Sequence, residues 1–197
     1  MSQSVKIEHG REIPTWIRMS ARTGVLTGTG SNGTLFSLRN TGANTLVGIK
    51  RVAVQWVATV APTTGQLIDI SLYFARAFTA ADSNGTAISF TTNRQKVRTP
   101  MVDPTVEARI ATTASVTSGT RTLDPLALAS VSGWINPAAT VMAQGSVIPL
   151  TELVTNEPEA VIWLAENEGI TVANGTPMGA ALLGTAIINI DFVQVRA

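Results

Sequence analysis

Apolar side chains recur with a period of two residues along much of this chain, and this pattern constrains the fold more than any other feature. In the segment 66–76, Ile68, Ile70, Leu72 and Phe74 alternate with mostly polar residues. Successive side chains of a β-strand point to opposite faces, so the pattern predicts a strand with one buried face. Similar patterns predict further strands at 35–39, 51–60, 106–111, 147–153, 160–165, 169–173 and 182–195.

Turn-forming residues separate these segments at short intervals. Asn-Gly pairs begin at Asn32, Asn84 and Asn174, and both residue types tolerate the positive φ of tight turns. The stretch 62–65, Pro-Thr-Thr-Gly, predicts an antiparallel hairpin between the strands on either side of it. Many short strands with such turns favour an all-β fold, an antiparallel β-sandwich or jelly roll.

Helix signals are weak and short. The stretches 79–82, 92–97 and 124–130 are each long enough for about one or two turns, and Asp124-Pro125 is a typical helix start. We therefore expect one or two short helices beside the sheets. Residues 23–197 are expected to form a single β-sandwich domain.

The first 22 residues are richer in charge than the rest of the chain and lack a clean period. Two interpretations stay open for residues 1–22. They form an ordinary edge strand, or they form an arm that leaves the domain and lies on a neighbouring subunit. Trp16, Ile17 and Arg18 are then the candidate contacts, because aromatic residues and arginine concentrate at interfaces.

Composition excludes several kinds of chemistry. The chain has no cysteine, which excludes disulfides, thiolate catalysis and cysteine-based zinc sites. Only 14% of the residues are charged, about half the usual share, so we expect a surface covered by partner subunits or by small polar residues. No apolar run approaches the roughly 20 residues of a membrane-spanning helix, and residues 1–15 lack the hydrophobic region of a signal peptide. We expect a protein made in the cytoplasm without a membrane segment.

The few charges are unevenly distributed along the chain. Residues 1–121 hold thirteen basic and six acidic side chains, and residues 122–197 hold one basic and seven acidic side chains. Two interpretations stay open: the two halves pair within one domain, or the basic half of one subunit faces the acidic half of the next in a cyclic oligomer.

No motif identifies a reaction centre. His9 is the only histidine, and the sequence marks no carboxylate or nucleophile beside it. The glycine pattern at 28–33 matches a dinucleotide-binding motif, but it precedes a predicted strand where that motif requires a helix. Four acids lie close together near the C-terminus and leave a glycan-hydrolysing or carbohydrate-binding module as an alternative: Glu157, Glu159, Glu166 and Glu168. We expect no enzyme, no metal and no cofactor.

Two charged segments complete the candidate interface. Arg94, Lys96 and Arg98 alternate, so in an extended segment they point the same way and either contact a partner or protect a sheet edge. The net charge of +1 argues against nucleic acid as the main ligand. Glu157 and Glu159 flank a proline in a predicted exposed loop.

Four segments resemble small structural proteins of tailed bacteriophages, a group that includes jelly-roll decoration, or cement, proteins of the capsid. They are Leu35-Phe36-Ser37-Leu38-Arg39-Asn40-Thr41-Gly42, Tyr73-Phe74-Ala75-Arg76-Ala77-Phe78-Thr79-Ala80-Ala81-Asp82, Thr122-Leu123-Asp124 and Leu164-Ala165-Glu166-Asn167-Glu168-Gly169-Ile170. The resemblance runs from residue 33 to the C-terminus and carries over no functional residue. It implies a non-enzymatic protein on the capsid surface of a virion, a homotrimer that clamps neighbouring major-capsid subunits. A tail, baseplate or fibre protein is the alternative within the same class.

Overall fold

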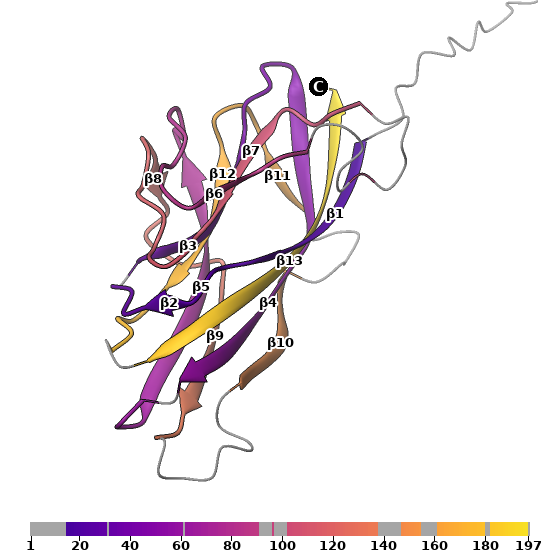
Figure 1. Ribbon diagram of the computed structural model, residues 1–197. Coiled ribbons are helices and arrows are strands. Elements are labelled where there is room, and N and C mark those ends of the chain that lie inside the picture. Colours follow the sequence, from indigo (N-terminus) through magenta and orange to yellow (C-terminus); the bar gives the residue numbers. More distant parts are fainter. Residues whose placement is uncertain are drawn as a thin grey trace, which may run out of the picture.

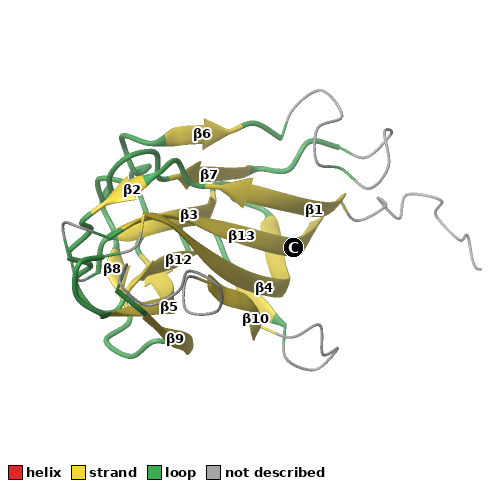
Figure 2. Cartoon of the chain, turned by 60° about the horizontal axis from the view of Figure 1, so that its bottom comes forward, coloured by secondary structure: helices red, strands yellow, loops and turns green. Residues whose placement is uncertain are grey.

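The computed structural model describes residues 15–30, 32–60, 62–90, 96, 102–137, 147–154, 161–179 and 182–196. Within these ranges every regular element is a β-strand, and no helix that could cross a membrane is found. The strands form two antiparallel sheets that pack together (Figures 1 and 2). The predicted antiparallel β-sandwich is therefore confirmed, whereas a jelly-roll strand order stays a prediction.

We call the two layers sheet A and sheet B. In order across sheet A lie β1 (Thr15–Arg22), β13 (Leu183–Arg196), β4 (Thr45–Val60) and β10 (Val147–Val154), with β2 (Leu26–Thr27) paired to β13 and β11 (Ile162–Leu164) paired to β4. In order across sheet B lie β6 (Thr86–Ile88), β7 (Val106–Ile110), β3 (Thr34–Asn40), β12 (Gly169–Asn174), β5 (Gln66–Arg76) and β8 (Thr122–Leu123), with β9 (Ala129–Ile135) also paired to β5.

The core lies between the sheets and is lined by the side chains that the period of two predicts. Ile68, Ile70 and Leu72 of β5 are fully buried, as are Ile188 and Ile190 of β13. Each such aliphatic side chain contributes about 1.5–3 kcal/mol to folding when it leaves water. The largest fully buried aromatic side chains are Phe36, Trp56, Phe78 and Phe192.

The predicted hairpin between 51–60 and 66–76 is wrong. β4 pairs with β13, β10 and β11 in sheet A, whereas β5 pairs with β12, β8 and β9 in sheet B. The turn at 62–65 therefore carries the chain from one sheet to the other. Alternation shows that each strand has one apolar face, and these two faces are buried across the core from each other.

The predicted short helices at 79–82 and 124–130 are also wrong, because the backbone of both segments binds parts of the chain that lie outside them. The amide of Asp124 donates to the Phe74 carbonyl at 3.0 Å, and that of Leu128 to the Leu72 carbonyl at 2.7 Å, so the chain follows β5 into β9. The amide of Thr79 donates to the Thr120 carbonyl at 3.0 Å. The third stretch, 92–97, lies outside the described residues except for its residue 96.

Residues 15–22 form β1, which pairs with β13 along its whole length at one edge of sheet A. Ile17 is buried in the core, and the hydroxyl of Thr15 donates to the Val102 carbonyl at 2.9 Å. An isolated bridge joins Ile17 to Lys96. Residues 1–14, the remainder of the segment considered as an arm, lie outside the described residues.

Some charges of the basic and acidic halves of the chain pair with each other within the sandwich. Seven ion pairs join described side chains, and four of them link a base before residue 122 to an acid after it. The four are Arg18–Asp191, Arg51–Glu152, Arg76–Asp124 and Arg76–Glu168. The hydrogen bond to Asp124 also raises the pKa of Arg76. The structure thus favours internal pairing over charge complementarity between subunits.

Candidate functional site

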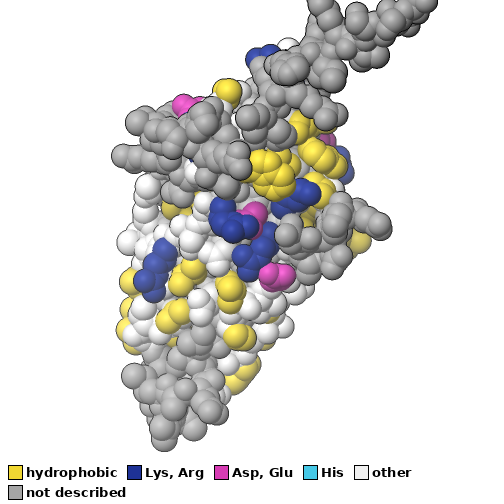
Figure 3. All heavy atoms as spheres, turned by 90° about the vertical axis from the view of Figure 1, so that its right-hand side faces the viewer, with side chains coloured by type: hydrophobic (Ala, Val, Ile, Leu, Met, Phe, Trp, Pro, Cys, Tyr) yellow, Lys and Arg dark blue, Asp and Glu magenta, His cyan; other side chains and the backbone are white. Residues whose placement is uncertain are grey.

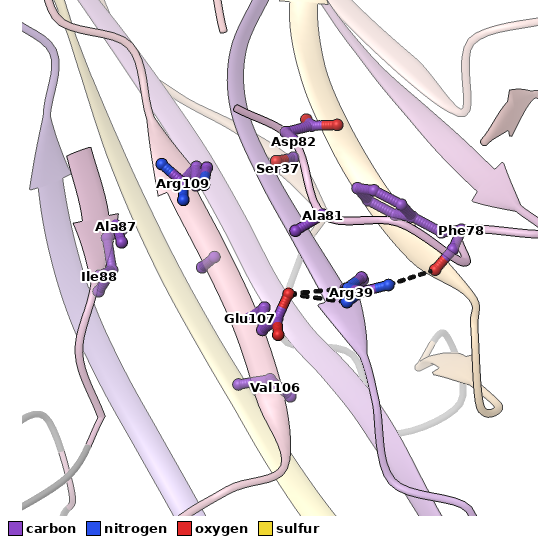
Figure 4. Close-up of a pocket in the computed structure, with 11 residues that line it drawn as sticks. Ser37, Arg39, Phe78, Ala81, Asp82, Ala87, Ile88, Val106, Glu107 and Arg109 are labelled. Carbon is purple, nitrogen blue, oxygen red and sulfur yellow. Dashed lines mark hydrogen bonds and ion pairs between the residues drawn. The ribbon is translucent and has the colours of Figure 1, made fainter. Parts of the chain in front are cut away.

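A recess of about 300 Å³ on sheet B is the first candidate for a site (Figure 4). Arg39 donates to Glu107 at 3.0 Å and to the Phe78 carbonyl at 3.0 Å, and Arg109 donates to the Asn84 carbonyl at 3.1 Å. These ionisable side chains are engaged in holding β3, β7 and the loop after β5 together. Their contacts are structural, so the recess is not our preferred functional site.

A buried ion pair fixes the loops that border this recess. The carboxylate of Asp82 accepts hydrogen bonds from Arg121 and from the Gly119 amide, and both charged side chains are almost fully buried. Arg121 also donates to the Thr34 hydroxyl at 2.7 Å and lies 5.0 Å from the centre of the Phe78 ring. This cluster holds the loops at 77–85 and 117–121 against sheet B.

The outer face of sheet A carries an apolar row that crosses four strands. Strand pairing places Trp16 of β1 opposite Val193 of β13, Val193 opposite Gly48 of β4, and Gly48 opposite Trp163 of β11. A Cβ at Gly48 would come within 2.9 Å of the Trp163 ring, so the glycine makes room for the indole against the strand. Trp16 is 39% exposed and Trp163 is 46% exposed. Both indoles are therefore partly exposed on this face.

A row of alternating charge lies beside the apolar row, one step further along the strands. Arg18 stands opposite Asp191, and Asp191 stands opposite Arg51. Arg18 meets the Asp191 carboxylate at 3.3 Å, and Arg51 meets the Glu152 carboxylate at 2.6 Å. At least one partner of each pair, Arg18 or Glu152, is open to water, and ion pairs screened by solvent contribute only about 0–1 kcal/mol each to stability. Their importance lies in the pattern of charge that they present.

A β-bulge adds a further cation to this face. β13 pairs Asp191 with Arg51 and Phe192 with Ile49, so Lys50 is the extra residue on β4. An extra residue interrupts the strict alternation of side chains along a strand. The ammonium of Lys50 lies 5.7 Å from the centre of the Trp16 ring. Figure 3 shows the basic side chains gathered next to exposed apolar ones on this side of the molecule.

The structure places the predicted interface residues in different environments. Trp16 and Arg18 lie on the outer face of sheet A, but Ile17 is 1% exposed and cannot contact a partner. Lys96 does not stand in an exposed basic row: its side chain is 5% exposed and pairs with Asp103 at 2.6 Å. The other four predicted positions, Arg94, Arg98, Glu157 and Glu159, lie outside the described residues.

The sequence did not predict that five further residues share one surface: Trp163, Lys50, Arg51, Glu152 and Asp191. Asp191 could be identified from the sequence as a polar residue within a predicted apolar strand, and Arg51 as the first residue of another predicted strand. Which strands lie side by side, and in what register, could not be derived from either segment. That information places the two arginines on either side of Asp191.

The carboxylates considered for glycan chemistry are partly committed to structure. Glu168 accepts a hydrogen bond from the Ala165 amide at 2.9 Å and pairs with Arg76 at 3.3 Å, whereas Glu166 is exposed. No group of three metal-ligating side chains occurs in the part of the chain that the structure describes. Comparisons of the chain with protein-family models, with curated proteins and with solved structures found no match.

Proposed function

We propose that this chain is a structural virion protein that decorates a tailed-phage capsid and attaches through the outer face of sheet A. The observation that carries the proposal is the pair of exposed indoles, Trp16 and Trp163, held in one row across four strands. That the particle is a tailed-phage capsid is inferred from the resemblance of the sequence to phage structural proteins. The homotrimer and the major-capsid partner belong to the same proposal.

The geometry supports attachment of modest strength. Covering the exposed parts of both tryptophans removes on the order of 200 Å² of mostly apolar surface from water, worth about 5 kcal/mol. Association costs consume much of this gain, so one such contact alone binds weakly. Repetition over a capsid lattice, and over the subunits of an oligomer, converts weak contacts into stable attachment through effective concentration.

Fractionation of purified particles into heads and tails, followed by mass spectrometry, tests the assignment. We expect the protein in the head fraction, in a fixed ratio to the major capsid protein. Recovery with the tails would favour the tail, baseplate or fibre alternative. Absence from both fractions would overturn the proposal.

Binding to heads that lack the protein tests the surface. Trp163→Ala should weaken co-sedimentation with such heads at least about tenfold, because it removes about half of the exposed indole surface. Trp134→Ala is the matched control, since Trp134 is 59% exposed but lies on β9 of sheet B. Equal binding by both variants would exclude the outer face of sheet A. Native mass spectrometry of the free protein should give a trimer, and a stable monomer would contradict that part of the proposal.

A further inference from the structure

The outer face of sheet A has more cations than carboxylates. Among the described residues, four basic side chains stand on this face, Arg18, Arg22, Lys50 and Arg51, against two acids, Asp191 and Glu152. The acids are already matched, because Asp191 meets Arg18 and Glu152 meets Arg51. The excess of positive charge therefore belongs to Lys50 and Arg22.

Neither of these two cations forms an ion pair with a described carboxylate. Arg22 donates one hydrogen bond, to the Thr185 hydroxyl at 3.4 Å, and Lys50 lies against the Trp16 ring. Lys50 thus adjoins the apolar row, and Arg22 stands two outward positions beyond Arg18 on β1. Lys50, a cation without a described carboxylate partner, lies beside an exposed indole, and Arg22 adds a second such cation further along β1, so an acidic surface complements this face.

We propose that the partner surface is an acidic protein surface that presents an apolar side chain flanked by carboxylates. This inference rests on the proposed function and specifies the chemistry of the surface that sheet A meets. The apolar side chain covers the indoles of Trp16 and Trp163, one carboxylate meets Lys50 beside Trp16, and a second carboxylate, further along β1, meets Arg22. A second copy of the same face complements it less well, because both of its acids are already paired and its described residues offer no further carboxylate to Lys50 and Arg22.

Nucleic acid is a second kind of partner to consider, because single strands bind basic grooves of proteins whose aromatic side chains stack on the bases. The interleaved carboxylates argue against it. Asp191 and Glu152 stand within the basic row and engage the guanidinium groups that would otherwise bind phosphates. A uniform row of phosphates would meet two fixed negative charges, whereas a protein surface can place its carboxylates selectively.

The first experiment measures binding to heads that lack the protein at several salt concentrations. Lys50→Glu should weaken binding about tenfold or more at low salt, and Lys50→Gln should weaken it less, with a smaller salt dependence for both variants. Arg109→Gln on sheet B is the matched control and should bind like the unaltered protein. Normal binding by Lys50→Glu would overturn the acidic partner while leaving attachment to heads intact.

The second experiment decides the inference without particles. The isotope-labelled protein is titrated with a synthetic peptide of alternating glutamate and leucine, with its lysine–leucine counterpart, and with oligothymidylate. We expect the acidic peptide alone to shift the indole signals of Trp16 and Trp163 and to leave that of Trp134 unchanged. No shift with the acidic peptide, or a larger shift with oligothymidylate, would overturn the inference even if the protein is found on heads.

Discussion

The buried pair of Asp82 and Arg121 allows a sharp test of what holds sheet B and its loops together. In Asp82→Ala, the Arg121 guanidinium keeps its charge in a site where its side chain is only 2% exposed, and the Gly119 amide loses its acceptor. Removing one partner of a buried ion pair costs about 3–5 kcal/mol, because the remaining charge is desolvated without compensation. For a chain of this size such a loss lowers Tm by roughly 6–20 °C.

Urea denaturation followed by circular dichroism measures this free energy, with Glu152→Gln as a control. Glu152 pairs with Arg51 on the surface, where its side chain is 41% exposed, so the control should lose no more than about 1 kcal/mol.

The double variant Asp82→Ala with Arg121→Met tests the reasoning when the single variant is too unstable to study. Removing both charges also removes the uncompensated guanidinium, and methionine can fill part of its space against Phe78. The double variant should therefore be more stable than Asp82→Ala alone. A cost below about 1 kcal/mol for Asp82→Ala, or a double variant that is less stable than the single one, would refute the argument.

Three further predictions follow from single positions. Gly48→Ala should displace the Trp163 ring, because the new methyl group would lie 2.9 Å from it; a changed indole signal with unchanged Tm is the expected result, and an unchanged signal contradicts it. Ile17→Ala should lower the free energy of unfolding in urea by about 2–5 kcal/mol, because Ile17 is buried, and Trp16→Ala should lower it clearly less. The reverse order would show that β1 does not belong to the core. Gly85→Ala should destabilise the protein, because φ is +62° and its methyl group would collide with a backbone carbonyl of β7; equal stability by thermal melting would be incompatible with this geometry.

The strands themselves follow closely from local sequence. β5 has the bounds that alternation predicts, and β3, β7, β12 and β13 differ from their predicted ranges by at most about two residues at each end. β9 was missed, since part of it was assigned to a helix beginning at Asp124. A start signal for a helix is a weak preference, and hydrogen bonds from Leu128 and its neighbours to β5 outweigh it.

The candidate site was only partly predictable. Trp16 and Arg18 were selected because their residue types favour interfaces, and both lie on the outer face of sheet A. Ile17 was selected with them, although the period of two places it on the opposite face. Trp163 carried no distinguishing signal along the chain, because the space that its ring occupies against β4 depends on Gly48, more than a hundred residues earlier.

The sequence alone determined the fold class. A strand with one buried face has apolar side chains at every second position, and a few neighbouring residues are enough to show that pattern. Only the tertiary structure decided which strands are neighbours: it separated β4 from β5 and placed β13 between β1 and β4. Partner and register depend on burying all the apolar faces together, which no single segment specifies. The same pairing joined the basic and acidic halves of the chain and set two distant tryptophans in one row beside Lys50.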